Sequence, residues 1–196
     1  MTDGVDLGRR RFLGVATGVT SAVGAAFVAV PFLASWKPSA RAQALGAPVE
    51  VDVSKLEEGA LLRVEWRGRP VWVLKRTPAM IERLDQADSM VRDPMSEEPQ
   101  QPPYAAGRLR SIKPGVLVVI GSCTHLGCSP TPRFEPGAQD LGADWPGGFF
   151  CACHGSKFDL AGRVWRGVPA PLNLVVPPHT YVDDQTILVG VDTEAA

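Results

Sequence analysis

Residues 123–128 read CTHLGC, and residues 151–156 read CACHGS. These two short stretches contain all four cysteines of the 196-residue chain and two of its three histidines. Cysteine thiolates and histidine imidazoles are the side chains that bind zinc, iron and iron–sulfur clusters in proteins. The pattern therefore predicts that the two loops form one site, with a metal centre, disulfide bonds or both.

Four kinds of site fit the spacings Cys-x-His-x-x-Cys and Cys-x-Cys-His. A structural zinc ion would use four of the six groups and leave two over. Two disulfides would leave the histidines without a role, and a thiol-redox centre would normally show a Cys-x-x-Cys spacing, which is missing. The fourth interpretation takes one cysteine and one histidine from each loop as metal ligands, and the other two cysteines then link the loops.

The sequence around these loops has the character of a β-rich head over residues 49–196. Short apolar runs separated by turn residues predict strands at 61–67, 70–76, 116–121, 148–150, 179–183 and 186–190. Residues 77–90 have helical character, and the proline-rich segment 93–107 predicts a surface loop. We therefore expect an all-β, antiparallel head with one short helix.

The N-terminal part of the chain differs from this head. Residues 12–36, FLGVATGVTSAVGAAFVAVPFLASW, contain no charged side chain. As a helix they would reach roughly 37 Å, which is enough to cross a hydrocarbon core of ~30 Å. A cleavable signal peptide is the alternative, because residues 40–42 have the A-x-A form of a cleavage site, but its apolar region would be only about 7–15 residues long. We expect a retained transmembrane helix.

Two further features concern export and charge. RRRFLG at residues 9–14 resembles the twin-arginine export signal, and three ordinary membrane-flanking arginines are the alternative interpretation. Twin-arginine export would place the head outside the bacterial cytoplasm, with residues 1–11 as a cytoplasmic segment. Residues 37–48 contain two prolines and several small residues without apolar periodicity, which predicts a flexible linker. The formal net charge of -1 argues against a nucleic-acid partner.

The two boxes, CTHLGC and CACHGS, resemble the cluster-binding boxes of the Rieske iron–sulfur proteins almost letter for letter. The resemblance extends to KRTP (75–78), RDP (92–94), GADWPGGFF (142–150) and GVPAPLNL (167–174). Together with the anchor and linker, it points to the Rieske subunits of bacterial ubiquinol–cytochrome c reductases, the cytochrome bc complexes. It implies a Rieske-type antiparallel β head, a small cluster-binding subdomain at about residues 116–176, and one 2Fe-2S cluster.

The resemblance also implies the ligands, which would be Cys123 and Cys151 on one iron and His125 and His154 on the other. The remaining pair, Cys128 and Cys153, would form a disulfide between the loops. Neutral imidazoles in place of two thiolates remove negative charge from the cluster. Its reduction potential would therefore lie at roughly -150 to +300 mV, a range that suits the oxidation of a quinol.

Other residues receive supporting roles from the same resemblance. Ser156 would donate a hydrogen bond to a bridging sulfide, and the loop Pro169-Ala170-Pro171 would cover the cluster. Leu126 would be an exposed apolar docking contact, and His154 would contact the quinol and accept its proton. His179 matches no ligand position and is interpreted as an ordinary strand histidine.

Two positions depart from the pattern of the family. Ala152 stands where proline is common, which should loosen the second loop slightly. Phe158 stands where many members have a tyrosine whose hydroxyl donates to the sulfur of the first cysteine ligand. Because phenylalanine cannot donate, the highest potentials of the family are not expected here.

The function implied is that of an enzyme subunit. It would take an electron and a proton from ubiquinol at a site shared with cytochrome b, and pass the electron to cytochrome c1 within a dimeric complex. The chain would be a single-pass protein of the bacterial inner membrane with a periplasmic head. The alternatives are the small Rieske subunit of a periplasmic oxidoreductase such as arsenite oxidase, a Rieske ferredoxin or oxygenase domain, and a zinc-binding module.

Overall fold

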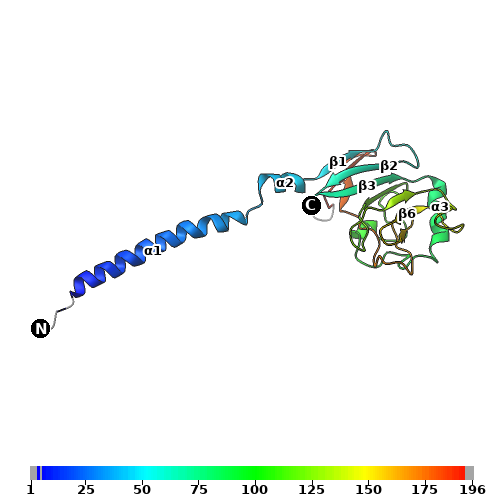
Figure 1. The fold of residues 1–196 in the computed structure, drawn as a ribbon. Helices are drawn as coiled ribbons and strands as arrows, with labels where there is room; N and C mark the ends of the chain where they lie inside the picture. The colour runs from blue at the N-terminus through cyan, green and yellow to red at the C-terminus, as the bar shows by residue number, and fades with distance from the viewer. Residues whose placement is uncertain (1–3, 5, 193–196) are drawn as a thin grey trace. The chain divides into compact units, whose positions relative to one another are not determined.

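The computed structural model of the protein describes residues 4 and 6–192. The chain divides into two compact units, with the division between residues 44 and 45. Figure 1 shows the long first helix and the β-rich head. Parts of the predicted N-terminal segment, and the last four residues of the predicted head, lie outside the described residues.

Helix α1 runs from Leu7 to Ser35 and contains the apolar stretch except for its last residue, Trp36, which is the C-cap. It begins where the Asp6 side chain accepts hydrogen bonds from the Gly8 and Arg9 amides, which satisfies two of the free donors at a helix N-terminus. Pro31 lies inside it, and none of its residues is buried in the protein. By length and composition, α1 can cross a membrane. Helix α2, Ala40–Gly46, lies in the segment predicted to be a linker.

The head contains three antiparallel sheets of three strands each within the described residues. Their orders are β1-β9-β8, β2-β3-β4 and β5-β6-β7. The strands are β1 Val49–Asp52, β2 Leu61–Trp66, β3 Arg69–Lys75, β4 Val116–Ile120, β5 Thr131–Arg133, β6 Gly148–Cys151, β7 Ser156–Phe158, β8 His179–Tyr181 and β9 Thr186–Val189. The all-β antiparallel prediction is confirmed, and β1, β5 and β7 are additions to it.

The predicted helix is α3, Pro78–Ala87, which ends three residues earlier than expected. The Thr77 side chain caps it by accepting from the Met80 amide, and proline at the first helical position has no amide to leave unsatisfied. Met80, Leu84 and Ala87 form its buried face.

The segment 93–107 is only partly the surface loop that its composition predicts. It contains a short 3-10 helix, η1, Pro103–Ala105. Ser96 and Ala105 are buried, so parts of the segment pack into the head. The prediction was wrong at these two positions.

The sheet β2-β3-β4 separates two hydrophobic cores. Along β3, Trp72 and Leu74 face the core that also contains Cys123 and Cys151, whereas Val71 and Val73 face the other core. This alternation follows from the two-residue period of a strand. Because both faces are covered, β4 is a rigid base for the first box, which begins just beyond its end.

Buried charge holds several loops around this base. Arg163 is fully buried, and its guanidinium donates to the carboxylates of Asp159 at 2.7 Å and Asp88 at 2.6 Å. It also donates to the carbonyl oxygens of Pro94 at 2.8 Å and Leu84 at 3.0 Å. One side chain therefore connects α3, the segment after it and the region following the second box.

Candidate metal centre

The two boxes occupy neighbouring turns of the head. The first box follows β4 and precedes β5, and the second is the turn between β6 and β7. Antiparallel pairing places Cys151 opposite Ser156 at the base of that turn. The sheet therefore fixes where the second box begins and ends.

Each box contains the same backbone turn. The Gly127 amide donates to the Cys123 carbonyl at 2.9 Å, and the Gly155 amide donates to the Cys151 carbonyl at 2.9 Å. Both glycines have positive φ, +85° and +78°, a conformation that glycine adopts without strain. The two boxes thus present their first cysteine in equivalent local settings.

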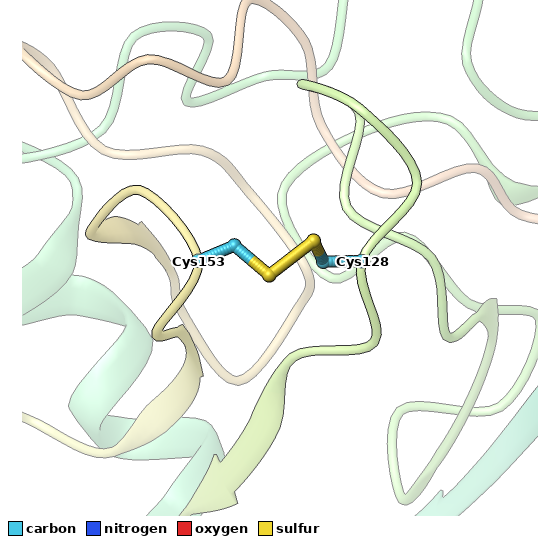
Figure 2. The surroundings of a disulfide bond; sticks show 2 residues. All are labelled: Cys128 and Cys153. Atoms are coloured by element: carbon cyan, nitrogen blue, oxygen red, sulfur yellow. A yellow bond between two sulfur atoms is a disulfide. The ribbon is translucent and has the colours of Figure 1, made fainter.

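A disulfide joins Cys128 of the first box to Cys153 of the second, as Figure 2 shows. The sulfur of Cys151 lies near this bond, since the sulfurs of Cys128, Cys151 and Cys153 are all within 4.8 Å of one another. A disulfide sulfur is not a thiolate ligand, so Cys151 is the one member of this group that can bind metal.

The other two cysteines, Cys123 and Cys151, are free and buried. Burial raises the pKa of the Cys151 thiol, with a further contribution from its hydrogen bond to Cys123. That hydrogen bond places the two thiols side by side. Metal coordination deprotonates a thiol, so a cation between them would reverse this preference for the neutral form.

The two box histidines meet at right angles. The rings of His125 and His154 are 4.6 Å apart between centroids, with an interplanar angle of 90°. His125 Nδ1 is buried and has no hydrogen-bond partner. Buried polar nitrogens are rarely left unsatisfied, so this atom fits a metal ligand. Two buried thiols and two adjacent imidazoles match the donor set of a Cys₂His₂ iron–sulfur cluster.

The loop Pro169-Ala170-Pro171 is tied to both boxes. The Ala170 amide donates to Ser156 Oγ at 3.0 Å, and Thr124 Oγ1 donates to the Leu172 carbonyl at 2.6 Å. Ser156 is fully buried, and its hydroxyl still has a proton to donate. Sequence reasoning missed Thr124, although its place inside the first box was a usable signal.

The remaining predicted residues lie in contrasting surroundings. Phe158 is fully buried in the core that contains Cys123, next to Phe149 on the paired strand. Leu126 is 71% exposed, so the first box presents an apolar side chain to the outside. His179 is buried in β8, where its Nδ1 lies 2.8 Å from the Pro177 carbonyl and its ring packs edge-on against Tyr104.

The fold and the paired boxes define a Rieske-type protein, and residues 48–178 match the family described as "Rieske [2Fe-2S] domain". Residues 1–39 match the family described as "Ubiquitinol-cytochrome C reductase Fe-S subunit TAT signal". The chain belongs to the Rieske iron–sulfur subunits of the ubiquinol–cytochrome c reductases.

Relatives that match over nearly the whole chain agree with this. The ubiquinol-cytochrome c reductase iron-sulfur subunit of Allochromatium vinosum is 61% identical over 98% of this chain and 93% of its own length. The subunit of the same name from Blastochloris viridis is 44% identical over 96% of both chains. The mitochondrial cytochrome b-c1 complex subunit Rieske of Schizosaccharomyces pombe is 42% identical over 88% of this chain and 67% of its own.

Proposed function

We propose that this chain is the electron-transfer subunit of a quinol-oxidising cytochrome bc complex. It would receive one electron and one proton from ubiquinol at a site shared with cytochrome b, and deliver the electron to cytochrome c1. The observation that supports this best is the pair of buried free thiols together with the partnerless His125 Nδ1. A 2Fe-2S cluster bound there supplies one-electron redox chemistry at a potential raised by its imidazole ligands.

Each box contributes one thiolate and one imidazole in this proposal. Cys123 and Cys151 would hold one iron, because both cysteines are free and buried in the same core. His125 and His154 would hold the other iron, on the outer side of the site. The Cys128–Cys153 disulfide would keep the two boxes together, and Ser156 would donate its remaining proton towards the sulfur atoms.

The two histidines differ in their access to a substrate. His154 is exposed, whereas His125 is half-buried. A quinol hydroxyl from outside the head would therefore meet the outer nitrogen of His154, which would accept its proton. The exposed Leu126 beside His125 offers an apolar surface for docking against the membrane partner.

We further propose that α1 is retained as a membrane anchor and that the head lies on the periplasmic side of a bacterial inner membrane. The apolar length of α1 and the match of residues 1–39 to a twin-arginine signal family support this. The complex would be dimeric. Carbonate washing of isolated membranes tests the anchor, since an anchored chain stays in the pellet and a peripheral one is released.

Electron paramagnetic resonance (EPR) of reduced membranes tests the metal centre. The wild-type chain should give a signal with an average g below that of clusters held by four thiolates, and a quinol-site inhibitor should change its shape. His154→Gln should abolish this signal, whereas the matched variant His179→Gln, in a histidine away from the boxes, should keep it. An average g typical of thiolate-only clusters would exclude histidine ligation.

A further inference from the structure

The loop over the boxes has a tether that lies outside the boxes. Arg92 Nη1 donates to the carbonyl oxygen of Pro171 at 3.0 Å. The next carbonyl, that of Leu172, accepts from Thr124, and the amide of Ala170 donates to Ser156. Three consecutive residues of the loop are therefore held by three different segments of the head.

The backbone around Arg92 is anchored firmly. The Arg92 amide donates to the Val164 carbonyl at 2.9 Å, and Val91, which is fully buried, forms an antiparallel bridge with Trp165. The Arg166 side chain adds a bond of 2.8 Å to the Val91 carbonyl. Because its backbone is fixed in this way, the Arg92 side chain can hold the Pro171 carbonyl in a defined position.

The hydrogen bond between Arg92 and Pro171 lies beside a cavity. A cavity separates the loop from the segment that follows Arg92, and its lining includes Arg92, Pro171, Asn173 and the acidic residues Glu97 and Glu98. Pro171 itself is exposed. Ala170 packs in the core, whereas at Pro171 the loop is exposed, and there the Arg92 side chain holds it at the rim of the cavity.

We propose that Arg92 is a positioning residue that fixes the loop of residues 169–172 over the two boxes and so protects the metal centre. This inference rests on the proposed function, because it takes the boxes as the cluster site. Arg92 acts through the loop and touches none of the proposed ligands in this role. Its loss should let the loop open, which exposes the boxes to water and chelators.

The test compares three variants of the full-length chain in detergent. Arg92→Leu removes the donor, and Arg92→Lys keeps a charged donor of similar reach. Arg83→Leu is the matched control, because Arg83 Nη1 also donates to a backbone carbonyl, that of Phe134 at 3.2 Å, elsewhere in the head. Hydrogen exchange at the Ala170 amide, the rate of cluster loss to a chelator and the urea midpoint of unfolding are measured for each.

We expect Arg92→Leu to speed both exchange at Ala170 and cluster loss roughly fivefold, the factor for one lost hydrogen bond of about 1 kcal/mol. Arg92→Lys should restore most of the protection, and the urea midpoint should match that of Arg83→Leu. Equal exchange at Ala170 in Arg92→Leu and Arg83→Leu would overturn the inference. If the wild-type chain held no histidine-ligated cluster, the proposed function would fail, and the exchange measurement would still decide the role of Arg92.

Discussion

Replacing Arg163 with methionine should destabilise the head severely. The guanidinium is 0% exposed and pairs with Asp159, whose side chain is 1% exposed. Methionine fills a similar volume without charge, so the Asp159 carboxylate would stay buried without its cation, and the carbonyls of Leu84 and Pro94 would each lose a donor. Removing one partner of a buried ion pair costs about 3–5 kcal/mol, a large part of a typical stability of ~5–15 kcal/mol.

Urea unfolding of the full-length chain in detergent, followed by tryptophan fluorescence, measures this cost. Arg133→Met is the control, because Arg133 pairs with Asp140 at the surface, where both side chains are about half exposed and the pair contributes ~0–1 kcal/mol. The double variant Asp159→Asn/Arg163→Met should cost less than the sum of its two single changes, since both single changes break the same buried ion pair. If Arg163→Met cost no more than Arg133→Met, the reasoning about buried charge would be refuted.

Three further changes test the site and its surroundings. Cys128→Ser should lower the free energy of unfolding by roughly 3.5 kcal/mol, because the disulfide spans a sequence separation of 25, yet it should leave a weakly bound cluster. Cys123→Ser should instead remove or re-ligate the cluster, and equal loss of visible absorption in both variants would contradict this division of roles. Phe158→Tyr should raise the reduction potential by about 20–65 mV if the new hydroxyl donates to the Cys123 sulfur, since one hydrogen bond contributes ~0.5–1.5 kcal/mol and ~59 mV corresponds to about 1.4 kcal/mol for one electron. An unchanged or lower midpoint in voltammetry would show that the hydroxyl does not reach. Burial lowers the pKa of His179. As the pH falls below about 6.5, the imidazole of His179 is therefore protonated more readily in the unfolded chain than in the folded one, and the free energy of unfolding decreases. His179→Gln should flatten this slope in urea titrations at pH 7.5 and 5.5, and an unaltered slope would assign it to other groups.

Much of the fold could be predicted because its signals are local. The hairpin β2–β3 follows from two apolar runs around Gly68, and α3 follows from a capping threonine before a proline. The boxes could be recognised because both carry cysteine and histidine at fixed spacings. That the two boxes together bind one iron–sulfur cluster could be predicted only from the resemblance to a family, since the spacing alone left four kinds of site open.

The parts that sequence reasoning missed depend on distant partners. Strands β5 and β7 are three residues long each, and they are strands only because β6 lies between them. Arg163 carries a charge, which is typical of a surface residue, yet the nearby carboxylate of Asp159 and oxygen atoms from two distant segments, the end of α3 and Pro94, make its burial possible. The Arg92 tether is a contact between residues far apart in the chain, which no local pattern encodes.

The pairing of β1 with β9 has a consequence for how the protein is made. Among the described residues, the first strand of the head pairs with the last one, and their register runs from Val49 opposite Val189 to Asp52 opposite Thr186. While the ribosome is still adding the residues before β9, β1 has no strand to pair with in the described part of the head, so this sheet closes only once β9 has been made. Such non-local closure is slow compared with helix formation. A translocation route that waits for a finished, folded cargo suits this order of events, and a route that threads the chain during synthesis would leave β1 and β9 to find each other on the far side of the membrane.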